Sequence, residues 1–79
     1  MTLMEKMQEA AQRAAVISVD DDICITIRVR NYGFLIQGQS EVGEKIKRIS
    51  MQLLWEQVEQ ANGNPLLSRV ERVAHDLSG

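Results

Sequence analysis

The sequence predicts an α+β domain in which a small antiparallel sheet packs against helices. Residues 23–30 alternate apolar and polar side chains, which is typical of a strand, and residues 65–77 carry apolar residues at helical spacing, starting with a proline. The chain of 79 residues is 44% hydrophobic and 25% charged, an ordinary globular composition for one domain spanning residues 1–79. Because an isolated hairpin is barely stable, we expect helices to cover its apolar face.

The first helix is predicted from Thr2 to about Ala15. Thr2 and Glu5 have the S/T-x-x-E spacing of a capping box, and apolar residues recur at helical spacing after them. β-branched residues begin at Val16, so residues 16–19 are either a last helical turn or a short strand, and their β-branching favours the strand. The acidic run at residues 20–22 then predicts a turn, because aspartate accepts local backbone hydrogen bonds.

A β-hairpin follows the acidic turn. The apolar face of its first strand, residues 23–30, consists of Ile23, Ile25, Ile27 and Val29. The turn ends at Gly33, which is free to adopt positive φ, and residues 34–37 form the return strand. A loop with an even number of residues places Phe34 and Ile36 on the isoleucine face, whereas an odd number places Leu35 there. We favour the even number because it gathers the apolar side chains.

Two helices are predicted in the remainder of the chain. Ser40 is a favourable N-cap for a second helix over residues 41–61, whose apolar residues at helical spacing are Val42, Ile46, Ile49 and Leu53. Gly63 is a natural helix stop, and Asn64 then caps a third helix with Pro65 at its first position. The apolar residues of this third helix are Leu66, Val70, Val73 and Leu77. The element order is thus α-β-β-α-α, or α-β-β-β-α-α with a three-stranded sheet if residues 16–19 pair.

The second helix is predicted to be apolar on two sides. Its first side is expected to bury Ile46 and Leu53 together with Ile25 and Ile27 of the strand. On a helix, the other side carries Met51, Trp55 and Val58. Either the third helix packs there, or this side is a protein interface, where tryptophan and methionine are enriched. The sequence leaves both explanations open.

No motif in the sequence points to a chemical reaction, so we predict that the protein is not an enzyme and uses no cofactor and no metal. His75, the single histidine, stands near the end of the third helix, where a solvated histidine interacts favourably with the helix dipole. Cys24 lies on the polar face of the strand and is expected to be a structural thiol. The acidic run at residues 20–22 lacks the alternating ligands and the glycine of a calcium loop, and no Cys/His pairing supports zinc.

The charge of the chain is unevenly distributed. The net charge is −2, yet residues 28–48 are basic, with Arg28, Arg30, Lys45, Lys47 and Arg48 against Glu41 and Glu44. This basic segment is the basis of an alternative function, that of a small nucleic-acid-binding regulator. The acidic total charge disfavours this alternative, and a single-stranded site also needs exposed aromatic side chains, which are scarce here. We therefore favour a protein partner over nucleic acid.

The sequence also bears on membranes and location. It contains no run of about 18 apolar residues, so we expect no transmembrane helix. The first residues include Glu5, Lys6 and Glu9, which do not fit a secretory signal. We therefore expect a cytoplasmic protein that does not bind membranes.

The text Ile25-Thr26-Ile27-Arg28-Val29-Arg30-Asn31, followed by Gly33 and Ile36, is similar to the strand-turn-strand of small phage-encoded anti-CRISPR proteins. The resemblance spans roughly residues 23–55, and it includes the chain size and an order of one N-terminal helix, a short antiparallel sheet and two C-terminal helices. The similar group is strongly acidic and imitates DNA, whereas the corresponding region here is basic. The resemblance therefore implies an inhibitor that docks on a protein, such as a CRISPR effector subunit, in the cytoplasm of a phage's host. It carries over no functional residue.

These observations together predict a non-enzymatic protein-binding inhibitor or regulator. The residues expected to contact the partner are Arg28, Arg30, Tyr32 and Trp55, because arginine and aromatic side chains dominate interface energetics. We also expect a homodimer, formed through a sheet edge or through the side of the second helix that carries Met51, Trp55 and Val58.

Overall fold

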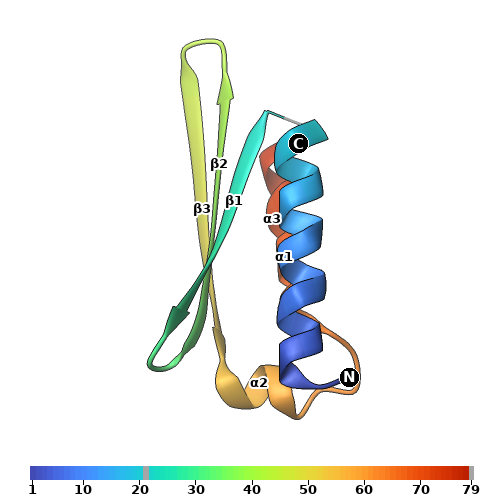
Figure 1. The fold of residues 1–79 in the computed structure, drawn as a ribbon. Helices are drawn as coiled ribbons and strands as arrows, with labels where there is room; N and C mark the ends of the chain where they lie inside the picture. The colour runs from blue at the N-terminus through green and yellow to red at the C-terminus, as the bar shows by residue number, and fades with distance from the viewer. Residues whose placement is uncertain (21, 79) are drawn as a thin grey trace.

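The computed structural model of the protein describes residues 1–20 and 22–78. Its elements are α1 (Leu3–Asp20), β1 (Ile23–Arg30), β2 (Gly33–Val42), β3 (Lys45–Leu54), α2 (Trp55–Glu59) and α3 (Pro65–Ser78). The strands form one antiparallel sheet in the order β1-β2-β3, and α1 and α3 pack side by side over one of its faces (Figure 1). This arrangement confirms the predicted α+β class and the order α-β-β-β-α-α, although the additional strand is residues 45–54 and not residues 16–19.

The first helix begins as predicted and ends later. The Thr2 N–H donates to Glu5 Oε1 at 3.1 Å, and the Glu5 N–H donates to Thr2 Oγ1 at 3.2 Å, so the capping box is confirmed. The Thr2 backbone N–H, and then its hydroxyl, lower the pKa of the Glu5 carboxyl. The cap's stabilisation is therefore present at neutral pH and is lost as the pH falls through this lowered pKa.

Residues 16–19 belong to α1, so the predicted end near Ala15 is wrong and the helical alternative is correct. The reason is burial: Ala10, Ala14 and Ile17 form one continuous buried row, which outweighs the strand preference of β-branched residues. Of the predicted acidic turn, Asp20 ends the helix and Asp22 lies in a bend, and Asp21 is outside the described residues.

The hairpin is confirmed with an even loop. Arg30 pairs with Gly33, so the loop consists of Asn31 and Tyr32, and Phe34 and Ile36 are opposite Val29 and Ile27. Phe34 and Ile36 are fully buried. Gly33 has φ +149°, and a Cβ there would collide with the Leu53 carbonyl oxygen, so this position requires glycine.

The predicted second helix over residues 41–61 is wrong. β2 continues to Val42, residues 45–54 form β3, and only Trp55–Glu59 are helical. Ser40 caps no helix, since it lies in β2 between Ile23 and Lys47 of its neighbours. Gly43, with φ +64°, allows the tight turn that returns the chain as β3.

Because residues 45–54 form a strand, the side chains of residues 45–58 face other directions than the predicted helix would give them. Ile46 is 55% exposed instead of buried with Ile25 and Leu53, and Met51 lies on the same side of β3 as Leu53. Val58 is fully buried on α2. The predicted helix side formed by Met51, Trp55 and Val58 therefore does not exist. Neither α3 nor a second copy of the chain can pack against it as predicted.

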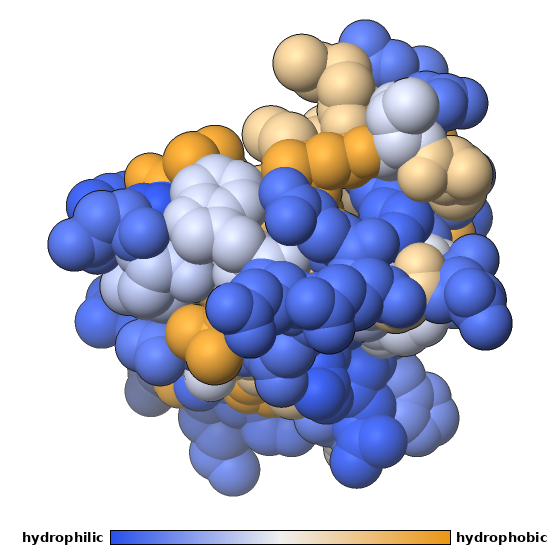
Figure 2. Space-filling view, turned by 90° about the horizontal axis from the view of Figure 1, so that it is seen from below, coloured by the Kyte–Doolittle hydropathy of each residue, from blue (hydrophilic) through white to orange (hydrophobic). Residues whose placement is uncertain are grey.

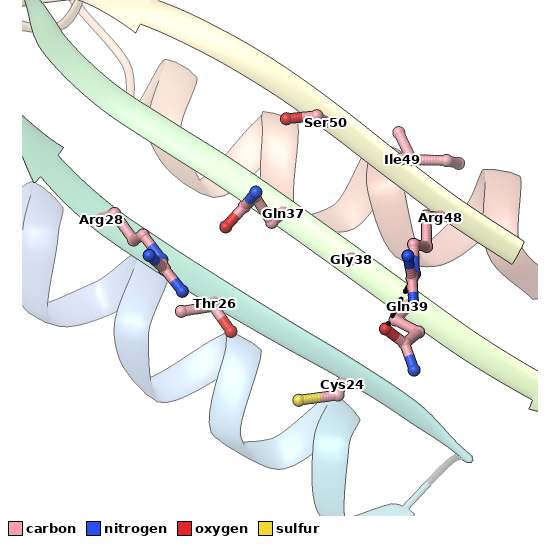
Figure 3. Close-up of a pocket in the computed structure, with 9 residues that line it drawn as sticks. All are labelled: Cys24, Thr26, Arg28, Gln37, Gly38, Gln39, Arg48, Ile49 and Ser50. Atoms are coloured by element: carbon pink, nitrogen blue, oxygen red, sulfur yellow. Dashed lines mark hydrogen bonds between the residues drawn. The ribbon is translucent and has the colours of Figure 1, made fainter.

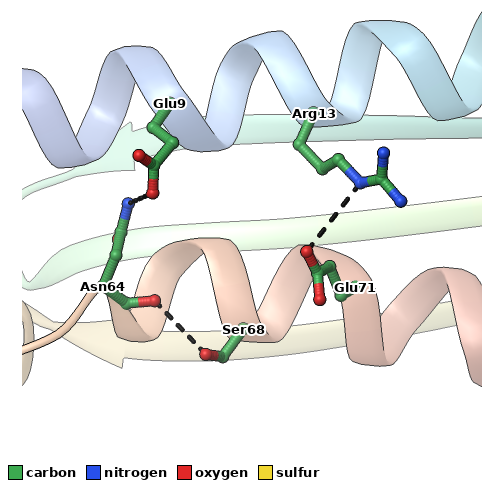
Figure 4. Close-up of polar contacts among 5 residues, drawn as sticks. All are labelled: Glu9, Arg13, Asn64, Ser68 and Glu71. Atoms are coloured by element: carbon green, nitrogen blue, oxygen red, sulfur yellow. Dashed lines mark hydrogen bonds and ion pairs between the residues drawn. The ribbon is translucent and has the colours of Figure 1, made fainter.

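The third helix is confirmed. The Asn64 side-chain oxygen accepts from the Leu67 N–H at 3.3 Å, which is the predicted N-cap. All four predicted apolar residues of this helix are buried: Leu66, Val70, Val73 and Leu77. Gly63 does not adopt the positive φ expected of a helix stop. Asn64 also donates to Glu9 Oε1 of α1 at 3.1 Å, and Figure 4 shows this contact beside the exposed Arg13–Glu71 ion pair.

Ser40 is a polar residue at a buried place in the sheet. It is 3% exposed, and its hydroxyl has no hydrogen-bond partner in the part of the chain that the structure describes. A buried hydroxyl without a partner costs stability, so Ser40→Ala should raise the free energy of unfolding by about 1 kcal/mol. Urea denaturation checks this, with the exposed Ser50→Ala as the matched control that should change nothing. A loss of stability in Ser40→Ala would show that the hydroxyl is satisfied.

Candidate functional site

One face of the sheet is covered by none of the helices that the structure describes, and we call it the open face (Figure 1). It consists of the residues that alternate with the helix-facing ones: Cys24, Thr26, Arg28 and Arg30 of β1; Leu35, Gln37, Gln39 and Glu41 of β2; and Ile46, Arg48, Ser50, Gln52 and Leu54 of β3. The strand register places these side chains in rows across the sheet, for example Thr26, Gln37 and Ser50. The open face is therefore a continuous, mainly polar surface.

The middle of the open face is hollowed. The hollow has a volume of about 560 Å³ and is lined by side chains of all three strands, among them Arg28, Gln37 and Arg48. Figure 3 shows these side chains on the side of the sheet turned away from the helices. Twisting of the strands produces such a concave surface, and the arginine and glutamine side chains that line it are hydrogen-bond donors.

The open face is cationic although the whole chain is acidic. Arg48 Nε donates to Gln39 Oε1 at 3.2 Å, and Gln39 Nε2 donates to Glu41 Oε1 at 3.3 Å, so Arg48 is held in a polar chain. By contrast, neither Arg28 nor Arg30 forms an ion pair or a side-chain hydrogen bond with any described residue. These two guanidinium groups are exposed and free to contact another molecule.

The four residues predicted to contact a partner lie at one end of the sheet. Arg28 and Arg30 are on the open face, Tyr32 is in the β1–β2 turn, and Trp55 follows β3 directly. The Trp55 backbone N–H donates to the Tyr32 carbonyl at 3.3 Å, so the structure brings these two residues together. Figure 2 views the molecule from this end and shows a mostly hydrophilic surface with hydrophobic side chains in separate groups.

Trp55 stabilises the end of the sheet at which the β1–β2 turn lies. Its indole Nε1 donates to the Asn31 carbonyl at 3.0 Å, and its ring meets Phe34 edge-to-face with centroids 4.8 Å apart. Trp55 and Tyr32 are both half-buried. Trp55 therefore fastens the hairpin turn to the start of α2, and the most accessible members of the predicted set are Arg28 and Arg30.

Several residues of the open face were missed from the sequence. Gln37 and Ser50 line the hollow but are not among the predicted site residues, and the predicted helix over residues 41–61 hides the common facing of Ser50 and Arg48. The signal that could have found them is the alternation of Ile49, Met51 and Leu53 with polar residues.

The structure brings neither Cys24 nor His75 together with other described side chains that could form a reactive site. Cys24 is exposed on the open face and His75 is exposed on α3, and no side-chain hydrogen bond joins either to another described residue. Within residues 1–20 and 22–78, no group of three or more His, Cys, Asp or Glu side chains is placed to hold a metal ion.

Comparison with models of protein families, with curated proteins and with solved structures gives no match to this chain. None of the helices that the structure describes is long and apolar enough to cross a membrane. The function proposed below therefore depends on the geometry of the open face.

Proposed function

We propose that the protein is a non-enzymatic binding module that docks on a protein partner through the open face, with Arg28 and Arg30 as its charged anchors. The observation that supports this proposal is that both arginines are exposed on the open face and pair with no residue that the structure describes. Arginine is enriched at the energetic centres of interfaces, where its planar group binds carboxylates through two parallel hydrogen bonds. The partner surface that fits is one that carries aspartate or glutamate side chains.

The composition of the open face favours a protein over single-stranded nucleic acid. Proteins that bind single strands stack bases on aromatic side chains, and the open face contains none. Tyr32 and Trp55 lie at the turn beyond the face and are half-buried. The three arginines of the face nevertheless support a second candidate, a nucleic-acid-binding regulator that uses residues 28–48, and the experiment below distinguishes the two.

The resemblance to anti-CRISPR proteins supports a narrower form of the proposal. The order of one helix, an antiparallel sheet and two helices is the one that the resemblance implies. In this form the partner is a CRISPR effector subunit, the protein is an inhibitor encoded by a phage or mobile element, and it acts in the host cytoplasm. Expression in a bacterium with an active CRISPR system should then restore plating of a targeted phage, and unchanged plating would contradict this form.

The double variant Arg28→Glu/Arg30→Glu should lose partner binding while it keeps its fold. Reversing both charges replaces attraction to carboxylates by repulsion, and loss of an anchor of this kind costs about 2 kcal/mol or more, roughly thirtyfold in affinity. The measurement is capture of partners from bacterial lysate by tagged wild type and variant, followed by mass spectrometry. Circular dichroism should be unchanged, since both side chains are exposed.

The matched control is Arg69→Glu/Arg72→Glu, which makes the same change in net charge on the exposed side of α3. It should capture the same partner as the wild type, and equal loss in both double variants would contradict docking by the open face. Titration with single- and double-stranded oligonucleotides at low salt should show no binding. Micromolar binding that weakens steeply with salt would favour the nucleic-acid regulator instead.

A further inference from the structure

β3 is an edge strand whose outer side is open. It pairs with β2 on one side only, and Val42 and Lys45 close the turn between them. Since hydrogen-bonded pairs alternate from the turn, the odd-numbered residues of β3 bond to β2 and the even-numbered ones direct their N–H and C=O outward. Leu54, an even-numbered residue, fits this pattern because its N–H donates to Gln57 Oε1 at 2.8 Å. Within the described chain, the outward N–H groups of Arg48, Ser50 and Gln52 meet no partner.

This edge lacks most of the devices that usually prevent strands from pairing, although the first half of β3 is charged. Its ten residues contain no proline, and its register with β2 is unbroken from Lys45 to Leu54, so no bulge turns it away. The long helices α1 and α3 lie over the face of the sheet and not beside the free side of β3 (Figure 1). At the other edge, by contrast, the Ser18 hydroxyl of α1 accepts the Ile25 N–H of β1 at 3.2 Å.

We propose that a second copy of this chain pairs with β3 in antiparallel orientation, with the two-fold axis at Ser50. The two large apolar residues that β3 exposes on the open face are Ile46 and Leu54, which are 55% and 50% exposed. They lie four residues on either side of Ser50. The symmetric pairing therefore sets Ile46 of one copy directly across from Leu54 of the other, twice, and covers both.

Two of the other pairs of this register are also complementary, whereas a third sets Lys47 across from Leu53. Ile49 lies across from Met51 on the helix side, and both are apolar residues only partly buried in the single chain. The charges of β3 are Lys45, Lys47 and Arg48, all in its first half. An antiparallel partner lays this basic half against the uncharged half, with Arg48 across from Gln52. A parallel partner would instead set like charges against each other.

The dimer joins two three-stranded sheets into one continuous sheet, and it uses β3, whereas the charged anchors assigned to the partner are on another strand. Arg28 and Arg30 are on β1, at the opposite edge. The open faces of both copies then lie on the same side of the joined sheet. A variant at Arg28 and Arg30 should therefore leave the dimer intact.

Ser50→Pro tests the edge. The Ser50 N–H points outward, so proline at this position removes no bond to β2 but blocks strand addition. Light scattering at micromolar concentration should give twice the 8.9 kDa mass for the wild type and for the control Ser50→Ala, and the single mass for Ser50→Pro. A wild type of single mass throughout this range, or a Ser50→Pro variant that is folded and still dimeric, would overturn the proposal.

Substitutions at Gln52 test the register without a proline. The carboxylate of Gln52→Glu would face Arg48 of the second copy twice, and each such pair contributes up to about 0.7 kcal/mol, so the dimer should tighten roughly tenfold. Gln52→Arg places like charges across the edge and should weaken the dimer by a similar factor. Sedimentation velocity measures both dissociation constants. Equal constants in the two variants would overturn the proposed register.

Discussion

Replacing Lys6 with alanine should lower the free energy of unfolding by about 3 kcal/mol, a large part of the stability of a small domain. Lys6 is 2% exposed, and its ammonium donates to the carbonyls of Val58 at 2.6 Å and Ala61 at 2.8 Å. These bonds tie α1 to α2 and to the loop after it. Without them, the carbonyl oxygens at the end of α2 lose their partner in a place where water is largely excluded.

Two further variants separate the loss of the hydrogen bonds from the loss of side-chain packing. Lys6→Met keeps most of the buried stem but lacks the ammonium, so it should lose the hydrogen bonds and little of the packing. The control Lys47→Ala removes an exposed lysine of β3 and should change stability by less than about 0.5 kcal/mol. Urea denaturation measures all three, and a Lys6→Ala protein as stable as Lys47→Ala would show that the buried lysine does not connect the helices.

Gly38→Ala should lower the free energy of unfolding by about 2 kcal/mol, because α3 packs directly on the backbone of the central strand at this point. A Cβ at Gly38 would collide with Val73 Cγ1 and come within 2.7 Å of Leu77 Cδ1. Both side chains are buried and cannot move aside freely, since Val73 is fully buried and Leu77 is 4% exposed.

Gly63→Ala is the matched control for Gly38. A Cβ at Gly63 meets no atom within 4 Å, and its φ is not positive. Alanine there should leave the stability unchanged or raise it by up to about 1 kcal/mol, because it restricts the unfolded chain. Thermal denaturation of both variants is the check. If the two alanine variants have the same melting temperature, α3 does not pack tightly against the backbone of β2 at Gly38.

The sequence predicts those elements whose signals are local. The alternation of residues 23–30, the glycine of the turn and the Asn64-Pro65 start of α3 each depend on neighbours in the chain, and all three are confirmed. The spacing of Ile46, Ile49 and Leu53 suits a helix, whereas Ile49, Met51 and Leu53 suit a strand. Pairing with β2 decides between them, and that pairing is not visible in either pattern.

The candidate site is partly predictable for the same reason. The facing of Arg28 and Arg30 follows from the parity of the strand that carries the isoleucines. The hollow needs Gln37 and Arg48 from two other strands, and their facing depends on a register that the sequence does not reveal. Lys6 was unrecognised because its partner carbonyl at Val58 is 52 residues away. The sequence predicts that Trp55 contacts a partner, whereas its indole bonds to the Asn31 carbonyl. That bond exists because β3 ends beside the hairpin turn, which the sequence does not reveal.

The thiol of Cys24 offers the most direct test of docking by the open face. Cys24 is the only cysteine of the chain, is exposed, and lines the same hollow as Arg28. It lies on β1, away from the edge assigned to the dimer, so pairing of two copies leaves it accessible. The measurement is the rate at which a maleimide labels Cys24 in the free protein and in the complex with its captured partner. We expect the partner to slow labelling at least tenfold, and an unchanged rate in the saturated complex would contradict docking through the open face.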